Sequence, residues 1–349
     1  MASPDQILKQ FADQALACEH LGSPFTARIC RATARVIDER TQFGRRILNW
    51  DGDPYADNVA LRAAGGLHAL ARSNWEPALT SVYPPNDVSE HTLGIAIRDT
   101  LTRHDRFLAD RLPSPPQTNE VARSAIILGA MLSVAEVTGQ PLEIFEIGAS
   151  AGLNLGFDRY RYALGEGRGW GDPGAPLTLE CDWRGSLPSL VAPLTVIGRH
   201  GCDLQPIDPD LVADRERLLS FVWADQTHRL ARLDTALKLA AAAHRQVDRG
   251  DAAEWLEQKF AVPQQPGVTR VLFHSIVWQY LPKATQDRIS ALLHRLGQSA
   301  SLEAPLAHIA IEADATPSKG ARIDMTLWPT GTRLTLGRGD FHGRWADWA

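Results

Sequence analysis

The sequence predicts an α/β protein with an N-terminal helical domain, a largely parallel sheet and a C-terminal antiparallel hairpin. Three observations support this fold class. Before about residue 112, apolar side chains recur at helical spacing. After residue 140, short apolar runs alternate with helical stretches, which is typical of parallel strands joined by helical crossovers. "ARIDMTLWPTGTRLTLGR" resembles two strands joined by a Pro-Thr-Gly turn, so we expect a hairpin at the sheet edge.

The first domain is expected to span residues 1–116. Ser3-Pro4 and Ser23-Pro24 each place a capping residue before proline and predict two helix starts. "DNVALRAAGGLHALAR" and "HTLGIAIRDTLTRHDRFLADRL" predict two further helices. Proline lacks an N–H donor and restricts the residue before it, so the proline-rich stretch at about 112–118 marks the domain boundary.

The second domain, 117–349, is expected to hold the sheet. "NEVARSAIILGAMLSVAEVTG" predicts a helix that ends at Gly139. Buried strands are predicted in "LEIFEI", "LTVIGRHGCDL", "HRQVDRGD", "TRVLFHSIVW" and "LAHIAIEAD". Helical stretches lie between them in "DRERLLSFVWADQTHRLARLDTALKLAAAAHR" and "KATQDRISALLHRLG". A glycine- and aromatic-rich insertion at about 157–193 interrupts the alternation as a hairpin or excursion.

The composition is that of a soluble globular protein, with 44% hydrophobic and 22% charged residues and a net charge of −5. No basic stripe stands out, so we expect no nucleic-acid partner. The four cysteines are far apart and form no CxxC pair, which favours a reduced protein without a metal site. No run approaches about 18 apolar residues and the N-terminus is charged, so we expect a cytoplasmic protein without a membrane span. The oligomeric state is left open.

The stretch "LEIFEIGASAGLNLGFD", residues 142–158, allows two interpretations. It contains G-x-S-x-G, the pattern of a hydrolase nucleophile elbow, with Ser150 as nucleophile and Asp314 and His342 as downstream partners. However, the residues upstream of 142 predict helices, and an oxyanion-hole loop needs a strand there. The dinucleotide-binding pattern G-x-G-x-x-G fits poorly, because Ser150 and Leu153 stand where it requires glycine.

The second interpretation is a cofactor loop with acids at the ends of successive strands. Glu146 ends the first strand, Asp203 the second, and Asp251 follows the third, directly before Ala252. Ligands of parallel sheets bind at the carboxyl ends of the strands. If the cofactor is S-adenosylmethionine, Glu146 would bind its ammonium group, Asp203 its ribose hydroxyls and Asp251 its adenine amine.

The ribose-binding acid has an alternative position. The gap between Glu146 and Asp203 exceeds the roughly 20 residues typical of such a unit, and the insertion would explain the excess. If "LTLECDW" is instead the second strand, Glu180 or Asp182 takes the ribose role.

Residues 142–314 resemble a class I, Rossmann-like S-adenosylmethionine-dependent methyltransferase domain. "FEIGASAGLNL" is similar to the first motif, "GCDLQP" to the acidic second, and "RGDAAEW" to the motif after the third strand. "RVLFHSIVWQYLP" is similar to the fourth strand and the loop beside the transferred methyl group. The resemblance implies S-adenosylmethionine as cofactor and implicates Glu146, Gly148, Ala149, Ser150, Gly152, Asn154, Asp203, Leu204, Asp251, Ala252 and His274 in binding it.

Almost the whole chain also resembles a bacterial family known as a domain of unknown function. The shared stretches include "LGSPFTARICR", "QTNEVARSA", "EIGASAGLNLGFDRYRY", "FVWADQTHRLARL" and "HGRW". That family brings no established substrate with it.

Two groups of residues are candidates for the substrate side. The helix over 119–138 runs antiparallel to the first strand, so Asn119 and Arg123 at its start should lie near the cofactor loop. His274 is a candidate general base because imidazole titrates near neutral pH, and Tyr280 is a second catalytic candidate. Trp278 and Gln279 follow the fourth strand and are expected to contact substrate.

A third group is spaced along "FVWADQTHRLARL". Trp223, Gln226, Arg229 and Arg232 recur at intervals of three, which predicts one face of a helix. That face is either solvated or, through Trp223, part of a substrate pocket.

These observations favour methyl transfer from S-adenosylmethionine to an unknown small molecule. A serine hydrolase using Ser150, a non-catalytic S-adenosylmethionine or nucleotide binder, and a protein-interaction scaffold remain as alternatives.

Overall fold

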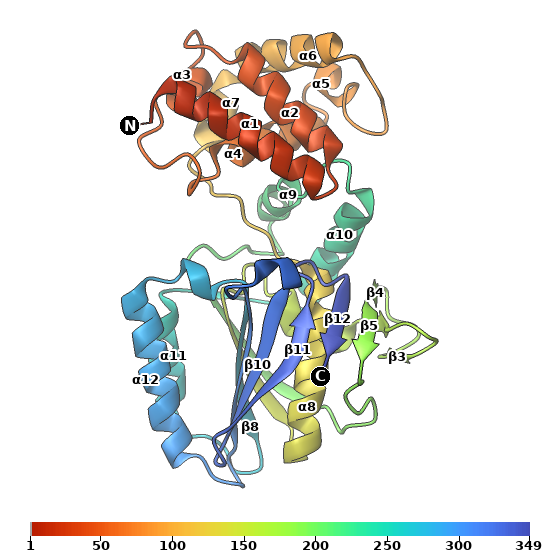
Figure 1. The fold of residues 1–349 in the computed structure, drawn as a ribbon, viewed down its shortest axis with the longest axis vertical. Coiled ribbons are helices and arrows are strands. Elements are labelled where there is room, and N and C mark those ends of the chain that lie inside the picture. Colours follow the sequence, from red (N-terminus) through yellow and green to blue (C-terminus); the bar gives the residue numbers. More distant parts are fainter. Residues whose placement is uncertain (1) are drawn as a thin grey trace. The chain divides into compact units, whose positions relative to one another are not determined.

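The computed structural model describes residues 2–349, and the chain divides into two compact units (Figure 1). The helical unit comprises the residues up to Thr118 together with Val212–Asp234. The α/β unit comprises Asn119–Leu211 and Thr235–Ala349. The return of 212–234 to the helical unit is a feature that helical periodicity does not reveal.

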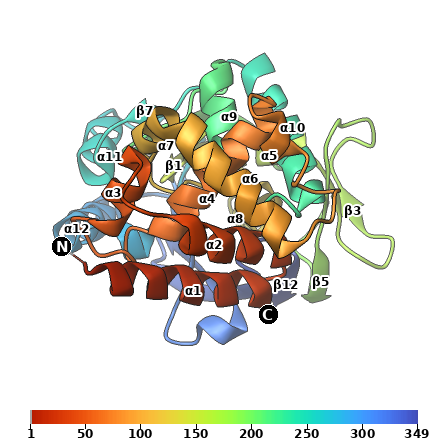
Figure 2. The ribbon, with the colours of Figure 1, turned by 90° about the horizontal axis from the view of Figure 1, so that it is seen from above.

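The helical unit is built around one apolar core. Its helices are α1 (Pro4–His20), α2 (Pro24–Val36), α3 (Gln42–Leu48), α4 (Val59–Ser73), α5 (Pro77–Thr80), α6 (Glu90–Arg103), α7 (Asp105–Arg111), α9 (Val212–Ser220) and the first half of α10 (Thr227–Ala242). α1 and α2 lie side by side (Figure 2). The stretch expected to form one helix over 91–112 is two helices, because the backbone leaves the helical conformation at His104.

The two predicted helix starts are capped differently. Ser3 caps α1 through a capping box with Gln6, as its sequence predicts. α2 begins at Pro24, as predicted, but the Ser23 side chain makes no cap hydrogen bond among the described residues, so its predicted capping role is wrong. Asp225 instead accepts the Phe25 N–H at 2.9 Å and the Ser23 hydroxyl at 2.5 Å. The returning segment therefore holds the first turn of α2.

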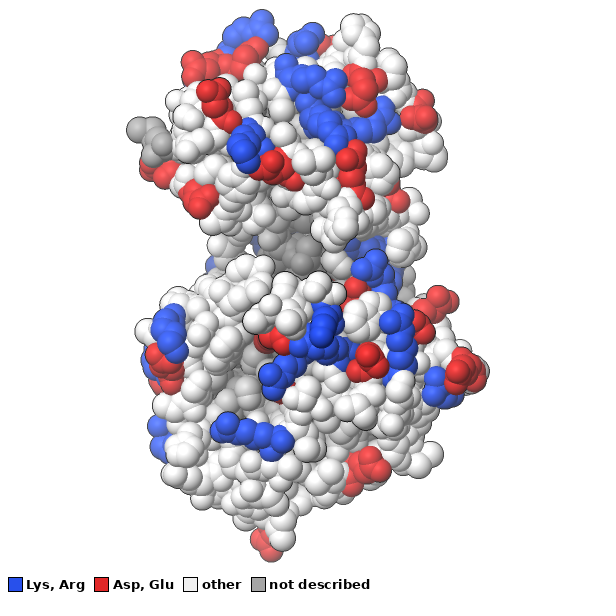
Figure 3. Space-filling model, in the orientation of Figure 1, with Lys and Arg blue, Asp and Glu red and all other residues white. Residues whose placement is uncertain are grey.

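The surface of the helical unit carries charges of both signs. Glu90 on α6 pairs with Arg28 and Arg35 on α2, at 2.7 and 2.8 Å. Acidic side chains accordingly lie beside the basic ones on the face shown in Figure 3. Glu90 thus joins α6 to α2 through two ion pairs.

Five parallel strands form one side of the main sheet, with β7 at its edge. They are β1 (Leu142–Ile147), β6 (Val196–Asp203), β7 (Asp248–Arg249), β8 (Thr269–Ser275) and β9 (Leu306–Glu312). Their order is β7-β6-β1-β8-β9, so the first strand lies between the second and the fourth. All five fall within the predicted stretches, which confirms the strand positions. The expectation that "HRQVDRGD" forms a buried strand is wrong, because β7 has only two residues and both are exposed.

The sheet continues beyond β9 through β10 (Ala321–Trp328), β11 (Thr332–Gly339), β12 (Trp345–Trp348) and β5 (Asp182–Gly185). β10 and β11 form the predicted antiparallel hairpin. The expectation that this hairpin is the sheet edge is wrong, because β12 and β5 pair beyond it. The ring centroids of Trp183 and Trp348 lie 4.9 Å apart, and the two rings pack over Gly129. A side chain at position 129 would collide with both rings.

The insertion adds a small separate sheet. β2 (Arg161–Ala163), β3 (Gly169–Trp170) and β4 (Thr178–Glu180) pair in the order β3-β2-β4. "LTLECDW" is therefore divided between β4 and β5, and neither strand lies beside β1. The alternative that this stretch is the second strand, with Glu180 or Asp182 at its end, is wrong. Asp203 ends the strand next to β1, as first expected.

Helices cover both faces of the main sheet (Figure 1). The remaining elements are η1 (Val121–Arg123), α8 (Ser124–Thr138), η2 (Asn154–Arg159), α11 (Ala252–Phe260), η3 (Trp278–Tyr280), α12 (Lys283–Ser299) and η4 (Pro317–Lys319). α11 and α12 bury Phe145 and Leu272 on one face, and α8 lies on the other. α8 ends at Gly139 in the left-handed conformation, as predicted.

One segment passes a test of length and composition for a membrane span. Val121–Thr138 is long and apolar enough, which corrects the expectation that no run reaches that length. In this structure 72% of the segment is buried, and α8 is the core helix on its face of the sheet.

One predicted helical stretch is interrupted, because residues 221–226 separate α9 from α10. Trp223 and Gln226 lie in the turn between α9 and α10, so the prediction that they share a helical face with Arg229 and Arg232 is wrong. Trp223 packs against the core of the helical unit.

Candidate functional site

The carboxyl ends of β1, β6 and β8 form one edge of the α/β unit. The chain order reverses here, because the second and third strands lie on one side of β1 and the fourth and fifth on the other. Open parallel sheets bind ligands at such reversals, where loops from neighbouring strands separate. The glycine-rich segment 148–152 follows β1 at this point.

The glycine-rich segment is a tight left-handed turn. Gly148, Ser150 and Gly152 have φ values of 68°, 54° and 66°, a region that favours glycine because it has no Cβ. A Cβ on Gly148 would collide with the Val277 side chain, and one on Gly152 would come within 3.0 Å of Val247. The two glycines are therefore required by the packing of the loop itself.

Asp203 ties the end of the second strand to this loop. Its Oδ2 accepts the Ser150 N–H at 2.9 Å, and its Oδ1 accepts the Gln205 N–H at 2.8 Å. The Ala149 N–H donates to the Cys202 carbonyl at 3.0 Å. The carboxylate is thus held at the edge with lone pairs remaining for further donors.

The Ser150 hydroxyl is not in the setting of a nucleophile. It is buried and has no hydrogen-bond partner among residues 2–349, so no histidine contacts it. A nucleophilic serine requires an adjacent base. Asp314 pairs instead with Arg338, which lowers the pKa of its carboxyl well below the usual range. The His342 backbone N–H donates to Asp340 at 2.9 Å.

Glu146 is a buried acid with one vacant oxygen. The side chain is 2% exposed, and its Oε2 has no partner among the described residues. Burial raises the pKa of the carboxyl to about 8, although a hydrogen bond from Asn154 and the charges of Arg123 and Arg245 oppose the shift. Buried polar atoms in proteins nearly always have partners. At this edge, the Glu146 Oε2 and the Ser150 hydroxyl are buried without partners among the described residues. A bound ligand could supply the missing hydrogen bonds.

The start of the helix before β1 lies at the same edge, as the sequence predicts. The Asn119 Oδ1 accepts the Leu153 N–H at 3.1 Å. The Arg123 guanidinium donates to the Ser275 carbonyl and hydroxyl at 2.9 and 2.8 Å. The Ser124 hydroxyl donates to the Asn154 Oδ1 at 2.8 Å. These bonds hold the loop after β1 and the end of β8 together.

The other predicted cofactor contacts differ in exposure. Leu204, directly after Asp203, exposes 64% of its surface. Asp251 caps α11, with its Oδ1 accepting the Ala253 and Glu254 N–H groups and its Oδ2 the Thr285 hydroxyl. Ala252 is buried in the first turn of α11. Asp251 therefore has a structural role that uses most of its acceptor capacity.

His274 is enclosed rather than presented to a substrate. It is 1% exposed, and its Nδ1 lies 2.6 Å from the Glu312 Oε1 and its Nε2 3.0 Å from the His308 Nε2. Both ring nitrogens are thus used within the protein. The Trp278 ring stacks on the imidazole at 5.0 Å.

The loop after β8 carries backbone strain. Ile276 has a φ of 53°, which is rare for a β-branched residue. The Glu312 carboxylate accepts the Val277 N–H at 3.2 Å and so holds this conformation. Strain of this kind concentrates at functional sites. Gln279 and Tyr280 follow on η3 and are exposed, Tyr280 by 72%.

Sequence reasoning missed His308, Glu312 and Arg245. Glu312 is the last residue of β9 and Glu146 the last but one of β1, and this position at a strand end was the signal for Glu312 in the sequence. His308 and Arg245 had no such signal. Arg245 is brought to the loop by tertiary contacts, where it donates to the Gly152 carbonyl at 3.2 Å. Among residues 2–349, no group of three or more His, Cys, Asp or Glu side chains is arranged to hold a metal ion.

The fold and this edge define an α/β protein with a glycine-rich loop and a buried acid at its first strand. Residues 8–348 match the family described as "Uncharacterized protein conserved in bacteria (DUF2332)". Because the match covers nearly the whole chain, the protein belongs to this bacterial family, which confirms the resemblance noted in the sequence. No curated protein and no solved structure matches the chain.

Proposed function

We propose that the protein is an S-adenosylmethionine-dependent methyltransferase that acts on a small molecule. The observation that carries the proposal is the contact between Ser150 and Asp203, which joins the glycine-rich loop after the first strand to an acid at the end of the second. The strand order supports it, because third-second-first-fourth-fifth is the order of Rossmann-like sheets.

The residues at the edge suit the parts of this cofactor. The vacant Oε2 of Glu146 would accept the ammonium group, and ionisation of the carboxyl would accompany binding. Asp203 has lone pairs left for ribose hydroxyls. The exposed Leu204 side chain would cover a face of the adenine. Asp251 fits its expected role at the adenine amine less well, because it already accepts three hydrogen bonds.

The bound cofactor would supply an electrophilic methyl group on its sulfonium. The protein's task is then to hold an acceptor atom in line with that methyl group and to exclude water. Both ring nitrogens of His274 already have hydrogen-bond partners, so it is not a general base in this proposal. Its role would instead be to position Trp278 and the loop after β8. Tyr280 is exposed on that loop and remains a candidate acceptor contact.

Calorimetric titration with S-adenosylmethionine and S-adenosylhomocysteine tests the proposal. We expect both to bind at one site, with Kd below about 100 µM, or roughly −5.5 kcal/mol. If neither compound gives a heat of binding at concentrations up to the millimolar range, the proposal is contradicted.

Two further measurements separate the alternatives. A serine hydrolase would be labelled covalently at Ser150 by a fluorophosphonate, and we expect no labelling. Mass spectrometry of small-molecule extracts incubated with protein and methyl-labelled cofactor should show one labelled product. Binding without any labelled product would instead favour a non-catalytic cofactor-binding protein.

A further inference from the structure

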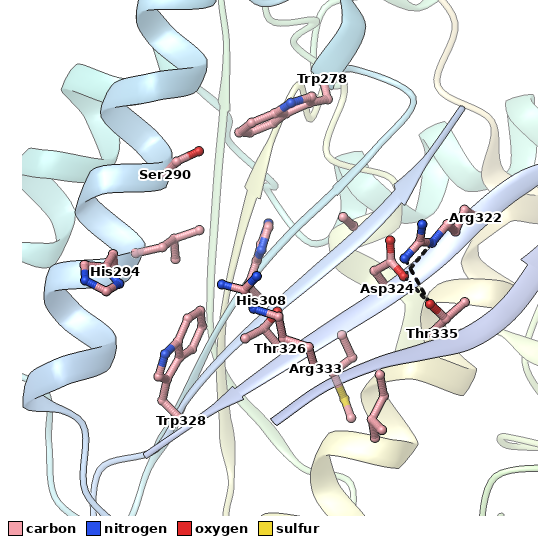
Figure 4. A pocket seen from close by; sticks show the side chains of 14 residues that line it. Trp278, Ser290, His294, His308, Arg322, Asp324, Thr326, Trp328, Arg333 and Thr335 are labelled. Atoms are coloured by element: carbon pink, nitrogen blue, oxygen red, sulfur yellow. Dashed lines mark hydrogen bonds and ion pairs between the residues drawn. The ribbon is translucent and has the colours of Figure 1, made fainter. Parts of the chain in front are cut away.

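A cavity of about 460 Å³, lined by both apolar and polar side chains, lies on one face of the main sheet, beside α12. Trp278 from η3, His294 from α12, His308 from β9 and Trp328 from β10 line it (Figure 4). All of its lining residues belong to the α/β unit. The cavity is separate from the glycine-rich loop, none of whose residues line it.

Strand register explains why polar side chains gather here. His308 lies opposite Thr326, and Ala310 lies opposite Asp324, in the pairing of β9 with β10. Thr326 in turn pairs with Arg333 on β11. Side chains alternate between the faces of a sheet, so paired residues share one face. These positions therefore form a continuous surface where the sheet continues past α12, and basic and acidic side chains gather over β10 and β11 in Figure 3.

The charges of the cavity leave one cation unneutralised. Arg322 pairs with Asp324 at 2.9 Å, and the Thr335 hydroxyl also donates to Asp324 at 2.8 Å. Arg333 is exposed, and its guanidinium makes no ion pair or hydrogen bond with residues 2–349. Because a guanidinium binds carboxylates through paired N–H donors, Arg333 suits an anionic group on a ligand.

His308 lies on the floor of the cavity, and its hydrogen bonding determines which chemical group it presents (Figure 4). An ionised Glu312 can only accept, so a neutral His274 carries its proton on Nδ1 and its Nε2 accepts from His308. The Nε2 of His308 is then the donor, and its Nδ1 retains a lone pair. That Nδ1 has no partner among the described residues and is not enclosed, so it is available to a donor in the cavity.

We infer that this cavity is a second ligand site, which takes a planar aromatic carboxylate carrying a ring N–H or O–H. The ring would lie among Trp278, Trp328 and the sheet, since tryptophan faces favour flat apolar ligands. The carboxylate would pair with Arg333, and the N–H or O–H would donate to the Nδ1 of His308. This site does not depend on methyl transfer, and its ligand can be bound whether or not the cofactor proposal is correct.

Indole-3-carboxylate is the probe that carries all three features. Indole lacks the carboxylate and 1-naphthoate lacks the N–H donor, so they serve as matched probes. In calorimetry on the full chain we expect indole-3-carboxylate to bind with a Kd below about 1 mM. Each matched probe should bind about tenfold more weakly, because each loses one hydrogen-bonded partner.

Two variants and two controls locate the probe. Arg333→Gln should weaken the binding of indole-3-carboxylate about tenfold and leave the affinity for indole unchanged. His308→Phe should remove the difference between indole-3-carboxylate and 1-naphthoate. Arg295→Gln, an exposed arginine on the same helix as His294, and His91→Phe, an exposed histidine of the helical unit, should leave all affinities unchanged. Nitrogen NMR should also show the Nδ1 signal of His308 shifting only when a donor probe binds.

Three outcomes would overturn the inference. One is no binding of indole-3-carboxylate at 5 mM, about fivefold above the expected upper limit of Kd. Another is binding that Arg333→Gln leaves unchanged while the His308 signal does not move. The third is a concentration-dependent dimer that Arg333→Gln disrupts without any probe binding, which would assign this face to contact between copies of the chain. Arg333 is exposed, so its variant keeps the test valid even if His308→Phe fails to fold.

Discussion

The Ser150 N–H donates to the Asp203 carboxylate over 2.9 Å, and this bond joins two segments that lie 53 positions apart in the chain. The serine in G-x-S-x-G thus contributes its backbone to the loop that follows β1, the strand that carries Glu146. Its hydroxyl is buried and has no hydrogen-bond partner among the residues that the structure describes. The bond connects the glycine-rich loop with the acid proposed to bind ribose.

Asp203→Asn should weaken S-adenosylmethionine binding by about 10- to 100-fold, because a neutral amide loses charge-assisted hydrogen bonds worth roughly 1.5–3 kcal/mol. Calorimetry measures the effect. Asp182→Asn is the matched control, since that exposed carboxylate on β5 pairs only locally with Arg184. Equal losses of S-adenosylmethionine affinity in the two variants would contradict the proposal that Asp203 binds the ribose.

Glu146 should make cofactor affinity depend on pH. Its pKa is raised to about 8 by burial, so the free protein is protonated at neutral pH. A cationic ligand prefers the carboxylate, and affinity should therefore rise with pH up to about 8, by at most tenfold per pH unit. In Glu146→Gln this dependence should disappear, while Glu180→Gln on β4 should retain it. A wild-type affinity that is flat between pH 6 and 8 would rule out the ammonium contact.

The same carboxyl should affect stability with the opposite trend. Between about pH 4.5 and 8 the native state holds a proton that the unfolded chain has lost, so the free energy of unfolding falls as pH rises. The slope from this one group is at most about 1.4 kcal/mol per pH unit. Denaturant unfolding of the full chain at several pH values measures it. The difference in unfolding free energy between Glu146→Gln and wild type should grow in favour of the variant as pH rises.

Gly148→Ala should destabilise the protein more than Gly139→Ala. Both glycines have φ near 65°, so both variants incur a left-handed penalty of about 1–2 kcal/mol. Only at Gly148 does the added Cβ also collide with the Val277 side chain, whereas no atom of residues 2–349 lies within 4 Å of a Cβ placed at Gly139. We expect the difference to exceed about 1 kcal/mol in chemical denaturation. Equal losses would show that Val277 does not pack on the loop.

Asp251→Ala should affect stability rather than cofactor binding. Its side chain caps α11 through two backbone N–H groups, and loss of such a cap costs about 0.5–2 kcal/mol. Thermal unfolding measures this cost, and we expect S-adenosylmethionine affinity to change less than threefold. A much larger loss of affinity in a folded variant would restore the role at the adenine amine.

Several elements could be predicted from the sequence because their signals are local. The apolar runs that form β1, β6 and β8 stand out by composition, and Gly139 ends its helix through left-handed backbone preference. The placement of Glu146 and Asp203 at strand ends follows from the same runs. Turn chemistry revealed the β10–β11 hairpin, but not that β12 and β5 extend the sheet beyond it.

The sequence by itself determined the α/β class, the order of the strands along the chain and the acids at their ends, because periodicity and turn chemistry act over a few residues. Only the tertiary structure decided that Asp225 returns to cap α2, that His274 is enclosed between Glu312 and His308, and that Glu146 keeps a buried vacant oxygen. Those features depend on which distant segments pack together. A side chain's burial and hydrogen-bond partners are set by that packing, and no spacing within one segment encodes them.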